Sequence, residues 1–119
     1  MLVSLPQLVC AHMGGWRNWQ EVADLLADTG AYLDTSFSLG TMTDNGDGYY
    51  GLGELELMDG EGFMALVRAF GAERILFGTD SPWGGQREEL QAIRALPLTG
   101  EERYAFLGRN ACRLLGLAK

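Results

Sequence analysis

The chain has 119 residues, of which 47% are hydrophobic and 21% charged, and its net charge is −7 at pH 7. This length and composition predict one globular domain, residues 1–119, and exclude a disordered chain. Nine lysines and arginines spread along an acidic chain do not make the basic patch that nucleic acid requires, and the apolar runs are too short for a membrane span of about 20 residues.

The first third of the chain is predicted to form a strand, a helix and a second strand. Residues 8–11 are a short apolar run that ends at His12, as in a buried strand. Between residues 16 and 29 the apolar positions fall on one helical face, and Gly30 follows where a left-handed C-cap is expected. Residues 31–35 are predicted to form the second strand.

Residues 37–58 are predicted to form a long loop, because they are rich in glycine and small polar residues. Loops of this length in compact domains are commonly lids or binding segments. A calcium-binding loop is an alternative, since part of the EF-hand pattern is matched by Asn45, Asp47, Gly48 and Glu54. Thr43 stands where the first aspartate belongs and no flanking helices are predicted, so we disfavour calcium.

A second helix is indicated by apolar residues between 63 and 70, and Gly71 closes it. Residues 74–79 give the strongest strand signal in the chain. After this strand, Ser81 is predicted to cap a helix that has Pro82 at its first position.

Two further helices are predicted near the C-terminus. Pro97 ends the helix that follows Pro82, and Thr99 with Glu102 forms a capping box for the next one. Residues 109–115 form a last short amphipathic helix. Alternation of strands and helices predicts an α/β fold with a parallel sheet covered by helices.

The two cysteines, Cys10 and Cys112, are far apart and each lies in an apolar stretch. Neither belongs to a CxxC pair or stands beside a histidine at metal-ligand spacing. We therefore expect two buried free thiols in a reducing compartment. Because the N-terminus also lacks the features of a secretory signal, a cytoplasmic location is expected.

Each of the three predicted strands ends in polar residues: His12, Asp34-Thr35-Ser36 and Thr79-Asp80-Ser81. Ligands of parallel α/β folds bind at the carboxyl ends of the strands, so these residues are expected to converge. His12 can ligate a divalent metal or shuttle a proton, or else bond within the fold. Asp80 can ligate a metal and take a proton from water, or else form a turn. Asp34 is expected to orient its neighbours.

Four segments together resemble the amidohydrolase-related family, the amidohydrolase 2 group of metal-dependent hydrolases and decarboxylases. They are Cys10-Ala11-His12-Met13-Gly14-Gly15, Tyr32-Leu33-Asp34-Thr35-Ser36, Ile75-Leu76-Phe77-Gly78-Thr79-Asp80-Ser81-Pro82 and the stretch from Gly108 to Leu117. The resemblance implies βαβ units that correspond to the last three strands and helices of a (β/α)8 TIM-type barrel. It implies that His12 and Asp80 are catalytic and metal-ligating residues, with zinc the usual ion and manganese an alternative. Asn110 matches a closing signature whose role is structural.

The chain departs from the family pattern in its ligand set. Family members carry a His-x-His pair on the first strand and another histidine on a middle strand, whereas this chain has one histidine in total. A catalytic zinc needs about three protein ligands, and a barrel needs about 250 residues. The expectation is therefore a C-terminal fragment, a truncated reading frame or one part of a split enzyme.

These features fit three functions to different degrees. We expect the C-terminal segment of a metal-dependent hydrolase or decarboxylase, which would act on a small molecule only when its missing N-terminal half is present. The alternative is a non-catalytic α/β module that self-associates or binds a partner through its sheet edge. A flavodoxin-like phosphate-binding domain is disfavoured, since His12-Met13-Gly14-Gly15 is not a phosphate loop.

Overall fold

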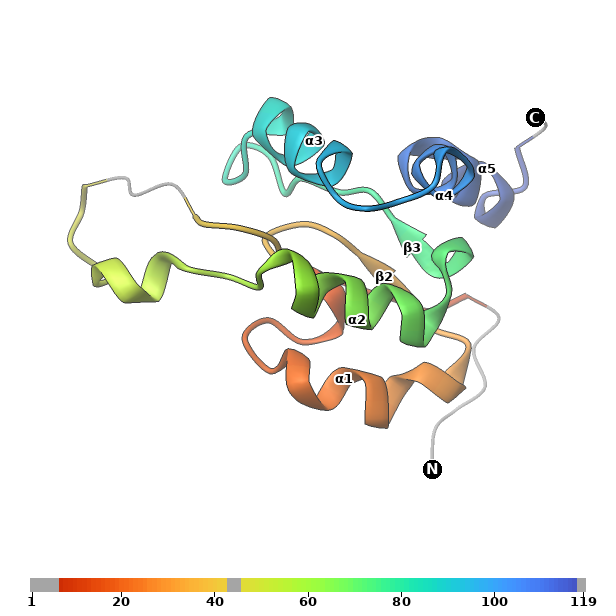
Figure 1. The fold of residues 1–119 in the computed structure, drawn as a ribbon, viewed down its shortest axis with the longest axis horizontal. Helices are drawn as coiled ribbons and strands as arrows, with labels where there is room; N and C mark the ends of the chain where they lie inside the picture. The colour runs from red at the N-terminus through yellow and green to blue at the C-terminus, as the bar shows by residue number, and fades with distance from the viewer. Residues whose placement is uncertain (1–6, 43–45, 118–119) are drawn as a thin grey trace.

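A computed structural model describes residues 7–42 and 46–117. It contains a three-stranded parallel sheet in the order β1-β2-β3 (Figure 1). The strands are short: β1 (Val9–Cys10), β2 (Tyr32–Asp34) and β3 (Ile75–Leu76). The predicted α/β fold with parallel strands is confirmed.

Helices pack against this sheet. In Figure 1, α1 and α2 lie side by side below the strands, and the later helices lie above them. The α-helices are α1 (Trp19–Leu26), α2 (Gly60–Phe70), α3 (Gln86–Arg94), α4 (Gly100–Tyr104) and α5 (Asn110–Leu114). Short 3-10 turns are η1 (His12–Gly14), η2 (Ala27–Thr29), η3 (Leu52–Leu55) and η4 (Ala72–Arg74), and η5 (Ala105–Arg109) is π-helical. No described helix has the length and apolar character that crossing a bilayer requires.

The two faces of the sheet differ in how well they are covered. Cys10 pairs with Leu33, which pairs with Ile75, so these three side chains share one face. Leu33 and Ile75 are completely buried in the main hydrophobic core, beside Phe63 of α2 and Phe106 of η5. This face is the one that the helices cover.

The opposite face carries the alternate residues of each strand. Tyr32, Asp34 and Leu76 on this face are only half-buried, and Val9 keeps 42% of its surface exposed. A strand face that holds apolar side chains in contact with water is incompletely packed.

The first helix begins later than the sequence pattern predicts. Residues 16–18 form a turn in which the N–H of Asn18 bonds to the carbonyl of Gly15 at 2.7 Å. Arg17 has a φ of 65°, which a right-handed helix cannot contain. The expected C-cap is confirmed, because Gly30 has a φ of 79°.

The helix predicted to start at Ser81-Pro82 was placed wrongly. The Ser81–Pro82 peptide is cis and belongs to a turn, and α3 begins only at Gln86. Proline at position N1 and a proline that completes a turn give the same short sequence signal.

The two C-terminal helices predicted as separate form one continuous helical run. The capping box of Thr99 and Glu102 opens it as predicted, and η5 then joins α4 to α5. Asn110 sits inside this run with no exposed surface. Its Nδ2 donates to the carbonyls of Ala72 (2.8 Å) and Ile75 (2.7 Å) and so fastens the run to β3.

Both cysteines are free thiols, as predicted. Cys10 and Cys112 are each partly exposed, however, so the expectation that they are buried was wrong. Partial burial still raises the pKa of the Cys10 thiol above its usual value.

Residues 37–42 and 46–58 contain little regular structure besides η3. Isolated bridges join Leu39 to Met58 and Thr41 to Glu56, so the two ends of this segment lie together. Residues 46–51 and η3 extend away from the sheet (Figure 1). Thr43 and Asn45, on which the calcium alternative depends, lie outside the described residues.

Candidate functional site at the carboxyl ends of the strands

Residues with a strained backbone conformation lie close to the carboxyl ends of the three strands. Among residues 7–42 and 46–117, five non-glycine residues have a positive φ. They are His12, Met13 and Arg17 after β1, Phe37 after β2, and Asp80 after β3. Such conformations cost about 1–3 kcal/mol each and typically occur at active sites and ligand clamps. This edge is therefore the candidate site.

His12 is held by residues that follow β2. Its Nδ1 donates to the backbone carbonyl of Ser36 at 3.0 Å and lies 3.2 Å from the Ser36 hydroxyl. Asp34 Oδ1 accepts the Ser36 hydroxyl at 2.5 Å, the Ser36 N–H at 2.9 Å and the His12 N–H at 3.3 Å. A carbonyl oxygen can only accept, so the Nδ1 of His12 carries a proton. The other ring nitrogen, Nε2, is left with its lone pair when the ring is neutral.

Phe37 contacts both sides of the site. Its carbonyl accepts the indole N–H of Trp16 at 3.0 Å, and its ring centroid lies 6.1 Å from that of His12. The His12 carbonyl in turn accepts the indole N–H of Trp19 at 2.9 Å. The loops after β1 and β2 are thus joined by several contacts around the imidazole.

Thr35 joins the ends of β2 and β3. Its side chain is completely buried, its hydroxyl donates to the Gly78 carbonyl at 3.3 Å, and the Gly78 N–H donates back to it at 3.1 Å. A Cβ on Gly78 would lie 3.3 Å from Asp34 Cγ, so the two chain segments approach closely here.

We expect Thr35→Val to lower the free energy of unfolding by about 1–3 kcal/mol. Valine keeps the shape but leaves the N–H and C=O of Gly78 without this partner in a buried place. Urea denaturation of both proteins measures the difference, and Thr29→Val at an exposed threonine is the control. Equal losses from the two substitutions would contradict the proposed link between β2 and β3.

Asp80 stands in the turn that follows β3. Its backbone carbonyl closes the turn by accepting the N–H groups of Trp83 (2.9 Å) and Gly84 (3.1 Å). The turn is thus closed by the backbone of Asp80 and not by its carboxylate, and the residue is exposed. β2 lies between β1 and β3, and neighbouring strands are about 4.8 Å apart, so His12 and Asp80 arise from strands about 10 Å apart.

Glu89 is a site residue that the sequence interpretation missed. It is partly buried and lines a cavity of about 230 Å³ between the loop after β2 and the turn after β3. Burial, and to a smaller extent the nearby charge of Asp34, raises the pKa of Glu89 to about 7, although the Phe37 N–H opposes this shift. A usable signal was present, because Glu89 lies four residues before the buried Ile93 and so on the inward face of α3.

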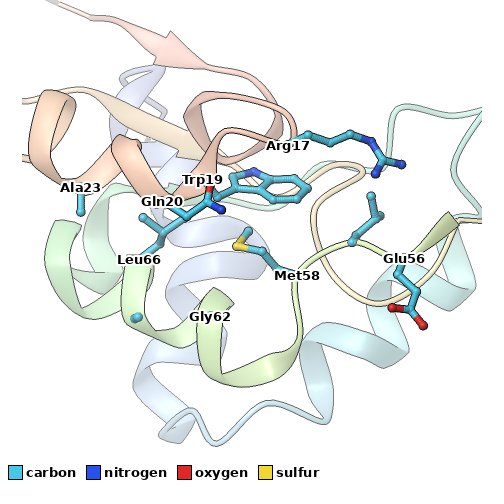
Figure 2. Close-up of a pocket in the computed structure, with 10 residues that line it drawn as sticks. Arg17, Trp19, Gln20, Ala23, Glu56, Met58, Gly62 and Leu66 are labelled. Atoms are coloured by element: carbon cyan, nitrogen blue, oxygen red, sulfur yellow. The ribbon is translucent and has the colours of Figure 1, made fainter. Parts of the chain in front are cut away.

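A larger cavity of about 510 Å³ lies on the helix side of the molecule, between α1 and α2 (Figure 2). Figure 2 shows Trp19 and Met58 directed toward it and Arg17 extended along its rim. Neither His12 nor Asp80 lines it. The larger cavity is therefore not the site formed by the strand ends.

The described residues supply only part of a metal centre. Within residues 7–42 and 46–117, no three His, Cys, Asp or Glu side chains are arranged to hold an ion. The type of donor nevertheless fits, because a metal-binding histidine commonly donates one ring N–H to a carbonyl and ligates through the other nitrogen. His12 makes this bond to Ser36.

The family model described as amidohydrolase matches residues 1–117. The chain belongs to the amidohydrolase family. The predicted resemblance is thereby confirmed. Curated protein sequences provide no match to this chain.

Several solved structures of this family share the fold. An amidohydrolase from Burkholderia multivorans with bound zinc has a TM-score of 0.66 at 22% identity, covering 94% of this chain and 44% of that one. A dihydroxybenzoic acid decarboxylase from Polaromonas sp. JS666, with bound manganese and 2-nitroresorcinol, has a TM-score of 0.60 at 17% identity, covering 92% and 33%. A putative 2-pyrone-4,6-dicarboxylic acid hydrolase from Pseudomonas putida has 0.60 at 20% identity, covering 92% and 43%.

These residues span about a third to a little under half the length of the matched structures. At these identities the likeness concerns the fold. Metals are present in two of the matched structures, zinc in one and manganese in the other.

Proposed function

We propose that this chain forms the C-terminal part of a metal-dependent amidohydrolase, with β1, β2 and β3 as the sixth, seventh and eighth strands of a barrel. The observation that carries the proposal is the strained, polar edge at which His12, Asp34 and Asp80 lie at or just beyond the carboxyl ends of three parallel strands. The uncovered face with Val9, Tyr32 and Leu76 supports it, because a closed barrel would bury that face.

A divalent metal would be held by the Asp80 carboxylate and the Nε2 of His12, together with ligands from strands that lie outside these residues. When bound, such an ion activates water and polarises a carbonyl or carboxylate of the substrate. Asp34 and Ser36 orient the imidazole by fixing the proton on Nδ1. The substrate is a small molecule, and the reaction is hydrolysis of an amide or ester, or decarboxylation.

Metal binding by the chain tests this proposal. Mn²⁺ suits the test because thiols such as Cys10 favour softer ions. We expect weak binding in a titration followed by electron paramagnetic resonance, and we expect Asp80→Asn and His12→Gln each to weaken it at least about tenfold. Asp28→Asn, at an exposed carboxylate of η2, is the matched control. Equal Mn²⁺ affinity in all four proteins would refute the assignment of His12 and Asp80.

A second candidate is a non-catalytic module that associates with itself or a partner. The exposed side chains of Leu8 and Val9 at the edge strand favour it. Under this alternative, gel filtration gives a concentration-dependent oligomer, and charged substitution of Val9 makes the chain monomeric. If the apolar edge and the metal site are independent, the charged substitution of Val9 will leave the Mn²⁺ affinity unchanged.

A further inference from the structure

The conformation of Phe37 requires support from its surroundings. Its φ of 49° is unfavourable for a residue with a bulky side chain, so neighbouring groups must hold it. Trp16 from the β1 loop binds its carbonyl. Glu89 of α3 lines the same cavity as Phe37, and the Phe37 N–H lies near enough to the Glu89 carboxyl to lower its pKa. Phe37 therefore lies between groups from two different elements.

Glu89 also contacts the turn that carries Asp80. Its Oε1 lies 3.4 Å from the position that a Cβ on Gly84 would occupy. The N–H of Gly84 donates to the Asp80 carbonyl. One carboxyl group thus lies against the segments that follow β2 and β3.

We propose that Glu89 is a positioning residue of this site: its carboxylate receives the Phe37 N–H and thereby holds the Phe37 ring beside His12, a role that rests on the proposed function. A charge-assisted hydrogen bond of this kind is about twice as strong as a neutral one. Protonation of Glu89 weakens the bond and loosens Phe37 from its left-handed conformation.

The charges around Glu89 favour its protonation near neutral pH. Asp34 faces it from β2, Glu88 lines the same cavity, Asp80 begins the adjacent turn, and His12 lies beyond Phe37. The described residues that line the cavity include no lysine or arginine. Since burial raises the pKa of Glu89 to about 7, its ionisation changes within the physiological range.

Nuclear magnetic resonance of the isotope-labelled chain tests the proposal without a metal or a substrate. We expect the Phe37 amide proton to move upfield as pH falls, with a midpoint near 7 that it shares with the Glu89 side-chain carboxyl carbon. Glu89→Gln should abolish this step and shift the ring protons of His12, whose signal is unambiguous because the chain has one histidine. Glu61→Gln, at an exposed carboxylate of α2 outside this cavity, should leave both unchanged.

Two results would overturn the proposal. One is a Phe37 titration step that survives in Glu89→Gln, which would assign it to another group such as His12. The other is a Phe37 amide in the unmodified chain whose midpoint differs from that of the Glu89 carboxyl carbon, a comparison that does not depend on the variant folding. Neither result depends on Mn²⁺ binding, so failure of the metal assignment and failure of the Glu89 role are told apart.

Discussion

Asn110→Ala is expected to lower the free energy of unfolding by about 3 kcal/mol or more. The Asn110 side chain has no exposed surface, and its Nδ2 donates to two carbonyls of the segment that leads into β3. Alanine leaves the Ile75 carbonyl without this donor, and a buried unpaired group costs about 1–3 kcal/mol, whereas the Ala72 carbonyl keeps the Ile75 N–H as a partner. The lost side chain also leaves a void. Urea denaturation of the two proteins measures the loss.

The same substitution at an exposed asparagine is the matched control. Asn18→Ala removes an amide that makes one long contact, 3.4 Å to the Trp16 carbonyl, and should change stability by less than about 0.5 kcal/mol. Asn110→Asp tests the direction of the bonds, because it places an acceptor against two acceptors in a similar volume. It should destabilise the chain at least as much as alanine does. A small loss from both Asn110 variants would mean that the helical run does not depend on this side chain.

Elements with a strong local pattern were predictable from the sequence. The order of strands and helices, the glycine at the end of α1 and the capping box at Thr99 each depend on a few adjacent residues. The predictions that were wrong concern segments whose residue types suit two different local conformations. Ser81-Pro82 fits both a helix start and a turn, and the sequence does not reveal that the π-helical turn of η5 joins α4 and α5.

The site was predictable only in part, for a related reason. His12, Asp34 and Asp80 were found because each lies at the end of an apolar strand, and parallel strands bring their carboxyl ends to one edge. The left-handed conformations of Phe37 and Arg17 have no signal in the sequence, since neither residue favours a positive φ. The positions of Trp16 and Glu89 beside Phe37 depend on long-range packing. Glu89 was overlooked because a single carboxylate on an amphipathic helix is usually a solvated residue.

The turn that carries Asp80 requires glycine at position 84, because a side chain there would collide with the backbone. A Cβ on Gly84 would lie 2.0 Å from the carbonyl oxygen of Thr79, a distance that real Cβ atoms do not adopt. Gly84→Ala therefore forces the backbone of the turn to move, and we expect a loss of about 3 kcal/mol in the free energy of unfolding. Because the Gly84 N–H also closes the turn on Asp80, we expect Mn²⁺ binding to weaken as strongly as in Asp80→Asn.

The adjacent glycine, Gly85, provides a control in which the added Cβ meets a side chain and not the backbone. A Cβ on Gly85 would also lie 2.0 Å from another atom, but that atom is the flexible carboxylate end of Glu88, which can rotate away. Gly85 has a φ of −78°, which alanine adopts freely, so Gly85→Ala should cost less than about 1 kcal/mol, mostly through a poorer N-cap for α3. The free energies of unfolding from urea denaturation and the Mn²⁺ affinities should therefore differ clearly between Gly84→Ala and Gly85→Ala, although the added Cβ lies 2.0 Å from its nearest atom in both. Similar effects would show that the turn after β3 yields easily, and a turn that yields easily could not fix Asp80 for a metal ion.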